Sequence, residues 1–310
     1  MPEHSVESPT TDRSPTTDLR PVERVVTAQR QTEGGGFVVR RPFPTAAADQ
    51  FDPFLLLDEM GPVEYGPGEA IGAPDHPHRG FETVTYMLDG AVEHRDSTGA
   101  VGVIRPGAVQ WMTAGSGVIH SEMPTEDIRR RGGRSHGFQL WVNLPAAQKM
   151  TPPRYQGFEA DEFTRADLPN GGMLRVLAGD VGGHVGPVET TIPITYAHVS
   201  LQPGEAVDWD VADGETALVH VFDGTARVND VDAVSGQLVV LERSSGSVRI
   251  AATGDGAEVL LLGGRPIGEP IARYGPFVMN TRTEIIEAID DFNAGRLGTI
   301  PGVGSGVRRN

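Results

Sequence analysis

The chain has 310 residues, carries a formal net charge of −16 at pH 7 and contains no cysteine. This length suits two domains or one large β domain, and the lack of a long apolar run excludes a transmembrane helix. Because cysteine is absent, disulfides and thiolate chemistry are excluded, and His, Asp and Glu are the only strong metal ligands left.

Residues 1–22 are rich in Ser, Thr, Pro and Asp and poor in apolar residues, which predicts a disordered tail. This segment lacks a basic start followed by an apolar stretch, so we expect no secretory signal and a cytoplasmic location. The acidic balance disfavours direct nucleic-acid binding. The one basic stretch, Asp127 to Arg134, is interpreted as a solvated loop.

From Arg24 onward, short β-type runs recur between turns rich in Gly, Pro, Asn and Asp. Examples are "TVTYML", "AVQWMT" and "GFQLWVNL" in the first half, and "YAHVSLQ", "ALVHVF" and "EVLLLGG" in the second. Many short strands at close spacing predict an all-β sandwich or barrel.

The two halves of the chain also look like copies of each other. Residues 83–90 ("TVTYMLDG") are similar to residues 216–224 ("TALVHVFDG"), and residues 107–122 align without a gap with residues 236–251. An internal repeat of strands implies two similar β domains in one chain.

The first copy places four candidate metal ligands in two short motifs. His76 and His78 are two residues apart, and so are His120 and Glu122. Because side chains alternate across a strand, the members of each pair share one face. Two adjacent strands that each contribute two ligands can close around one ion.

The second copy lacks this ligand set. Arg249 and Ala251 take the place of the second motif, and only the carboxylates of Asp208 and Asp210 lie near the place of the first. A purely structural need would recur in both copies, so the asymmetry predicts one metal per chain, in the first half. Three imidazoles and one carboxylate suit Fe(II), Mn, Co, Ni, Cu or Zn.

The motif His76-x-His78 followed by His120-x-Glu122 resembles the cupin superfamily and, within it, the pirin family. The stretches "FDPFLLLDEMGP", "HPHRGFETVTYMLDG", "MTAGSGVIHSEMP", "HGFQLWVNLP" and "GPFVMNTRTEI" are similar to pirin segments and span most of residues 40–290. The resemblance implies an all-β bicupin, with two jelly-roll β-sandwich domains and metal only in the first. The family's ligands match these four residues one for one, and Fe²⁺ is the expected ion, with the other divalent metals as alternatives.

On this basis, residues 23–150 are expected to form the metal-binding N-terminal cupin domain and residues 151–280 a C-terminal cupin domain without metal ligands. Residues 281–296 are expected to form a helix that packs on the N-terminal domain. Its sequence begins with a capping box from Thr281 to Glu284 and continues with an apolar stripe at i, i+4 and i+7.

The remaining histidines are not expected to be ligands. His94 lies on the far strand of a hairpin that closes at "DSTG", so a surface or turn-bonded position is expected. His136 precedes "GFQLWVNL", and the sequence does not place it relative to the pocket. His184, His198 and His220 fall in the half without a motif.

Glu82 is the position at which the general cupin motif carries its acidic ligand, whereas in pirins that ligand comes from the second motif, which Glu122 fits. Glu82 shares a strand face with His78. Two interpretations stay open for it: a carboxylate that holds a ligand histidine, or an ordinary strand residue.

Two functions remain open for the predicted site. The resemblance to pirins implies a quercetin 2,3-dioxygenase-like enzyme that cleaves a flavonol, a small aromatic substrate, with O₂, and Glu122 would then be both ligand and catalytic base. The alternative is a non-enzymatic, metal- or redox-sensing regulator that acts through protein partners. The same four ligands serve both, and for either function we expect a monomer without a membrane partner.

Overall fold

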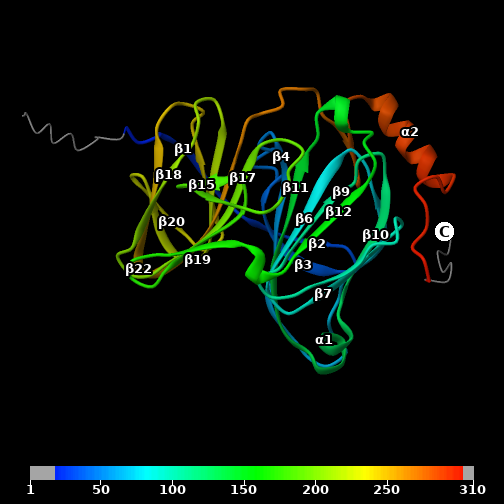
Figure 1. Ribbon diagram of the computed structural model, residues 1–310, viewed down its shortest axis with the longest axis horizontal. Helices are drawn as coiled ribbons and strands as arrows, with labels where there is room; N and C mark the ends of the chain where they lie inside the picture. Colours follow the sequence, from blue (N-terminus) through cyan, green and yellow to red (C-terminus); the bar gives the residue numbers. More distant parts are fainter. Residues whose placement is uncertain (1–17, 303–310) are drawn as a thin grey trace, which may run out of the picture.

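The computed structural model describes residues 18–302, which fold into two β lobes lying side by side (Figure 1). Helix α2 (Arg282–Asn293) lies beside the N-terminal lobe, away from the C-terminal lobe (Figure 1). This arrangement confirms the predicted all-β bicupin fold with a C-terminal helix. No helix among the described residues is long and apolar enough to span a bilayer.

The N-terminal lobe is a sandwich of a seven-stranded and a four-stranded antiparallel sheet. In spatial order, the larger sheet contains β12 (Arg154–Phe158), β9 (Val109–Thr113), β6 (Phe81–Asp89), β11 (Gly133–Asn143), β4 (Phe54–Tyr65), β3 (Phe37–Phe43) and β2 (Gln29–Glu33). The smaller sheet contains β5 (Ala73–His78), β10 (Val118–Pro124), β7 (Val92–Asp96) and β8 (Val101–Ile104). Both predicted ligand motifs lie on the smaller sheet.

The C-terminal lobe is built on one nine-stranded sheet. Its strands are β1 (Val22–Thr27), β21 (Gln237–Leu241), β19 (Thr216–Val228), β22 (Ser247–Gly264), β17 (Ile194–Leu201), β14 (Met173–Ala178) and β13 (Thr164–Asp167), with β18 (Ala206–Asp210) on β22 and β20 (Val231–Val234) on β19. Two small hairpins pair β15 (Asp180–Val181) with β16 (His184–Val185), and β23 (Ala272–Tyr274) with β24 (Phe277–Met279). The remaining helical turns are α1 (Glu126–Arg131), η1 (Ala146–Gln148) and η2 (Ala160–Glu162).

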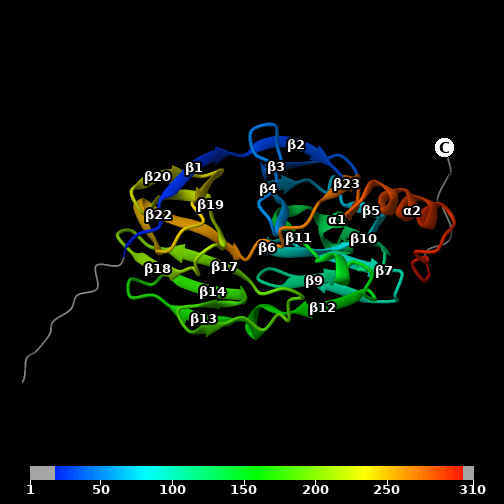
Figure 2. The same cartoon turned by 90° about the horizontal axis from the view of Figure 1, so that it is seen from above.

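The two lobes exchange strands across the expected domain boundaries (Figure 2). β1 pairs with β21 of the C-terminal lobe, and β12, which follows residue 150, pairs with β9 of the N-terminal lobe. Each sheet thus includes a strand from the other side of the expected boundary. The division into residues 23–150 and 151–280 stays a prediction.

Residues 1–17 of the predicted tail, residues 1–22, lie outside the described residues. Beyond that point the chain is packed on the C-terminal lobe. Arg20 is fully buried, and its guanidinium donates to three backbone carbonyls between residues 211 and 215.

The predicted repeat is visible in the backbone. Gly107 and Gly236 have φ angles of 83° and 84°, and Gly117 and Gly246 have φ angles of 129° and 128°. Glycine tolerates these conformations, which other residues rarely adopt. The two copies therefore turn in the same way at both matched glycines.

A buried carboxylate lies between the lobes, beside the apolar core that they share. Glu59 of β4 is fully buried, accepts hydrogen bonds from Arg40 and from His136 Nε2 at 3.0 Å, and has an oxygen 3.6 Å from His220 Nε2 of the other lobe. Burial alone would raise the pKa of Glu59. The contacts with His136, His220 and Arg40 outweigh burial and lower that pKa to about 2.

Because its folded-state pKa lies below the usual 4.5, Glu59 contributes stability that is present above about pH 4.5 and lost as the pH falls toward 2. The shift corresponds to about 3 kcal/mol. In urea unfolding, the wild type should therefore lose about this much more free energy of unfolding across that window than Glu59→Gln does. The exposed Glu64→Gln on the same strand is the control and should behave like the wild type. Parallel pH profiles for Glu59→Gln and the wild type would contradict the assignment.

Candidate metal centre

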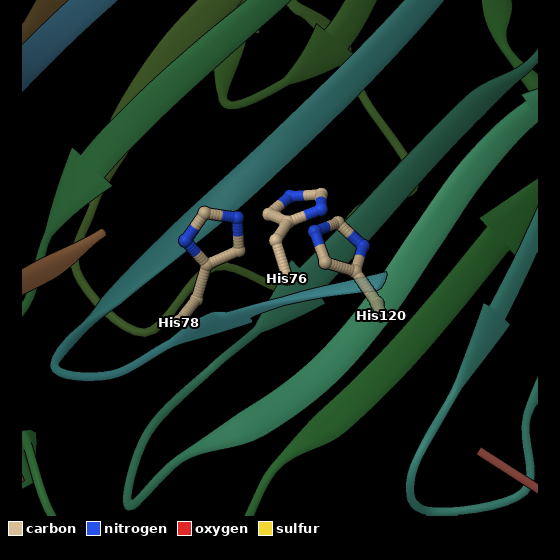
Figure 3. Close-up of side chains that lie close together, drawn as sticks. All are labelled: His76, His78 and His120. Carbon is tan, nitrogen blue, oxygen red and sulfur yellow. The ribbon is translucent and has the colours of Figure 1, made fainter. Parts of the chain in front are cut away.

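The pairing of β5 with β10 brings the three predicted histidine ligands together. His120 lies opposite His76 in the antiparallel register, and His78 follows on β5. One ring nitrogen from each residue lies within 4.8 Å of the others, and the rings converge on one point (Figure 3). Within residues 18–302, this is the one group of three or more His, Asp or Glu side chains close enough to hold an ion.

The surroundings of each ring leave its Nε2 atom available as the ligand. His76 Nδ1 donates to the carbonyl of Pro74 at 2.7 Å, and His78 Nδ1 lies 3.4 Å from the carbonyl of Pro276. The Nε2 of His120 is buried and has no hydrogen-bond partner. Burial, followed by the neighbouring imidazoles, lowers the pKa values of His78 and His120 well below the usual range, so both rings are neutral and able to bind a cation. These three residues therefore fit a divalent metal.

Of the two positions expected for His94, the surface one is wrong, because the residue is fully buried, and the turn-bonded one agrees with its contact to Asp96 of the "DSTG" turn. Its Nε2 donates to Asp96 Oδ2 at 3.0 Å, which leaves Nδ1 to face His120 Nδ1 at 3.4 Å. Asp96 also accepts hydrogen bonds from the backbone N–H groups of Thr98 and Ala100, in and just after the "DSTG" turn. The carboxylate of Asp96 therefore links His94 to this turn. The chain Asp96–His94–His120 orients His120 and fixes its proton on Nδ1.

Glu122 lines the same cavity as His76 and His78 but does not belong to the tight group of three histidines. Its Oε1 accepts hydrogen bonds from the hydroxyl of Thr85 at 2.5 Å and from the amide of Gln110 at 3.4 Å. Its Oε2 has no hydrogen bond to any described residue. Its role as fourth ligand stays a prediction.

A cavity of about 680 Å³ lies inside the N-terminal lobe, beside the histidines. Its apolar walls include Leu56, Met60, Met87 and Trp141. A volume of this size and a mostly apolar lining with a few polar groups are typical of small-molecule sites. The arrangement combines a metal centre with room for an organic ligand.

Residues 265–280 form a strap that returns from the C-terminal lobe to the N-terminal lobe (Figure 1). Three of its residues, Arg273, Gly275 and Pro276, line the cavity. The strap is attached through Lys149, the only lysine of the chain, whose buried ammonium group donates to the carbonyls of Gly80 and Val278 and to Asn143 Oδ1. Sequence reasoning missed this wall, because no motif connects it with the ligand strands.

The other candidate residues do not belong to the group of three histidines. Glu82 accepts hydrogen bonds from Thr113 and Thr191, so its described partners are threonines and not a ligand histidine. His136 faces Glu59 between the lobes rather than the metal cavity. His198 also lies between the lobes, where its ring lies 2.8 Å from the hydroxyl of Tyr86; neither it, His184 nor His220 joins a metal-binding group.

The matched strand pair of the second copy has the same register but different chemistry. Arg249 lies opposite Asp208, as His120 lies opposite His76, and the two form an exposed ion pair at 2.9 Å. The interior of that lobe is filled by apolar side chains such as Trp209 and Ile250. The predicted asymmetry between the copies is thus present in the structure.

Two cupin-type lobes with a histidine cluster in only one of them define a bicupin with a candidate metal centre. A sequence model of the family described as "Pirin" matches residues 36–142, and one described as "Pirin C-terminal cupin domain" matches residues 196–298. The chain therefore belongs to the pirin family, as the resemblance predicted.

Individual relatives agree with this assignment over nearly the whole chain. A "Pirin-like protein" of Caulobacter vibrioides is 46% identical over 90% of this chain and 99% of its own. A protein of Pseudomonas aeruginosa named "Putative quercetin 2,3-dioxygenase" is 46% identical over 87% of this chain and 95% of its own. A crystal structure of quercetin 2,3-dioxygenase from Acinetobacter baumannii superimposes with a TM-score of 0.86 at 39% identity, covering 91% of this chain and 99% of that one.

We predict one metal ion per chain, bound in the N-terminal lobe. His76→Ala or His120→Ala should abolish binding, because each removes one of three converging ligands. His220→Ala should retain one ion, because His220 lies between the lobes. Metal analysis of the purified, folded variants checks this; two ions per chain, or full occupancy in His120→Ala, would contradict it.

A second prediction concerns His94. His94→Phe keeps the ring volume but removes the acceptor for His120 Nδ1, so metal affinity should fall by about 10- to 100-fold. Tyr155→Phe is the matched control, because the Tyr155 ring stacks on His94 at 4.9 Å and the variant keeps that contact. Competition with a metal chelator measures both affinities. Unchanged affinity in His94→Phe would show that the chain from Asp96 does not support the centre.

Proposed function

We propose that this pirin is a metal-dependent dioxygenase that cleaves flavonols such as quercetin with O₂. The observation that carries the proposal is the apolar cavity of about 680 Å³ lined by His76, His78 and Glu122. The name of the Pseudomonas relative and of the Acinetobacter structure supports the same substrate class. Fe²⁺ is the proposed ion, and Mn, Ni, Co, Cu and Zn share its preference for this donor set.

The residues proposed to hold the ion are the Nε2 atoms of His76, His78 and His120, with Glu122 as the fourth ligand. Three neutral imidazoles and one carboxylate leave a divalent ion with net positive charge and open positions for a substrate. When bound, such an ion supplies Lewis acidity that lowers the pKa of a coordinated hydroxyl and a redox-active centre for reaction with O₂.

The protein's own contribution begins with the cavity walls. A flavonol is planar and aromatic, and Leu56, Met60 and Trp141 offer apolar surface on which such a ring system can pack. Packing there excludes water from the reacting atoms. It also directs the polar edge of the flavonol, with its adjacent hydroxyl and carbonyl oxygens, toward the histidines.

Glu122 is proposed to accept the proton of the flavonol hydroxyl. Transfer from a phenol of pKa near 10 to an ordinary carboxylate near 4 is uphill by roughly 8 kcal/mol, so the base works only on a hydroxyl that is already acidified. The hydrogen bonds from Thr85 and Gln110 hold Oε1, so Oε2 would serve both roles, with one lone pair for the ion and the other for the proton. The carboxylate is thereby held on the cavity wall in one orientation.

We expect Glu122→Gln to retain metal at weakened affinity while turnover of quercetin falls by about 10²- to 10⁴-fold, the usual effect of losing a general base. The amide keeps the shape and one oxygen but removes the charge. An oxygen electrode measures turnover, and metal analysis measures occupancy. Glu126→Gln, on the exposed helix α1 nearby, is the control.

Full metal and full rate in Glu122→Gln would exclude Glu122 as the base. The absence of oxygen uptake by the metal-loaded wild type with any flavonol would contradict the enzyme proposal. That outcome would favour the regulator that acts through protein partners.

A further inference from the structure

The cavity is lined by two arginines, and only one of them is paired with protein carboxylates. Arg41 forms a two-point ion pair with Asp58, at 2.6 and 2.5 Å, and a further contact with Glu33 at 2.6 Å. Arg273, on the strap, forms no hydrogen bond or ion pair with any residue in the described part of the chain. Its N–H groups are therefore free to meet a ligand, although the nearby carboxylates of Glu33 and Asp58 already attract its charge.

The guanidinium of Arg273 lies over an aromatic ring. Its guanidinium carbon lies 4.8 Å from the centre of the Trp141 ring, and the Trp141 ring lies 5.3 Å from the ring of His78. The Trp141 ring thus lies between the guanidinium and His78 of the metal centre. A guanidinium over a ring keeps the N–H groups that point away from the ring available, and its planar fork matches a carboxylate or sulfonate.

One aromatic side chain, Trp141, contacts both Arg273 and His78. Trp141 packs on Phe81 at 4.3 Å between ring centroids as well as on His78, so it contacts both a core ring and the metal centre. A planar ligand that lies against Trp141 with one end at the histidines can place a substituent at its other end near the guanidinium. Arg273 is exposed, so a substituent beside it stays partly hydrated, which limits the cost of bringing an anion there.

We propose that Arg273 is a specificity-determining residue that binds an anionic group at the end of the ligand remote from the metal. The preferred ligand is then a planar phenol that carries a negatively charged substituent, not an uncharged one. This inference rests on the proposed function, because it concerns the substrate class of the same cavity.

The test compares quercetin with quercetin-5′-sulfonate, whose added charge lies on the pendant ring and not on the ring that carries the chelating oxygens. Binding to the metal-loaded, full-length protein is measured by calorimetry without O₂, so that no turnover occurs. The wild type should bind the sulfonate about tenfold more tightly than quercetin, as expected for one hydrogen-bonded charge pair. Added salt should reduce this preference.

Arg273→Gln should lose the preference for the sulfonate while it keeps its affinity for quercetin. Arg273→Lys keeps the charge but not the fork and should retain part of the preference. Arg282→Gln, which removes one exposed charge at the start of α2, should behave like the wild type. Metal content and thermal unfolding of each variant show that the centre and the fold are unchanged.

Equal affinity of the wild type for the two ligands, or an unchanged preference in Arg273→Gln, would overturn the inference and leave the flavonol function standing. Failure of the wild type to bind either ligand would overturn both. The two failures are therefore distinguishable in one set of titrations.

Discussion

The antiparallel pairing of β5 with β10 is the constraint on which the candidate site depends. It sets His120 opposite His76, and the period of two along a strand then brings His78 to the same face. A slip of one residue would turn every side chain of one strand to the opposite face and separate the ligands. The register is held on the other side of β10 as well, where His120 and Glu122 lie opposite Asp96 and His94 of β7.

This arrangement has a cost that a metal ion would offset. The neutral imidazoles of His78 and His120 are buried close together, and the Nε2 of His120 has no partner among the described residues, which is unfavourable for a buried polar atom. An ion that binds only the folded chain would satisfy that atom and stabilise the protein by mass action. The C-terminal lobe avoids the cost by filling its interior with apolar side chains, and its matched charged residues, Arg249 and Asp208, pair at the surface.

Strand β4 shows how one element serves both the cavity and the junction between the lobes. Asp58 lines the cavity and pairs with Arg41, whereas its neighbour Glu59 lies on the opposite face among His136 and His220. Alternation along the strand therefore separates two sets of charged groups. The ion pair of Asp58 with Arg41 lies at the cavity, and the ion pair of Glu59 with Arg40 lies at the junction between the lobes.

Local patterns in the sequence predicted much of this structure. The alternation of short strands predicted the β lobes, the matched glycines predicted the repeat, and the capping box of Thr281 and Glu284 predicted the start of α2. The histidine pairs were predictable because a strand fixes which residues share a face. The burial of His94 and the place of Arg273 were not, because both depend on which strands and straps pack together at long range. The exchange of β1 and β12 between lobes was hidden for the same reason.

The central claim is that one metal ion is held by three histidine Nε2 atoms at the edge of the cavity. Anomalous X-ray scattering from crystals of the metal-loaded protein tests it most directly. The account predicts one peak per chain, within bonding distance of the Nε2 atoms of His76, His78 and His120, with Glu122 as the nearest carboxylate. A peak bonded elsewhere, or an empty histidine cluster in fully metal-loaded protein, would contradict it.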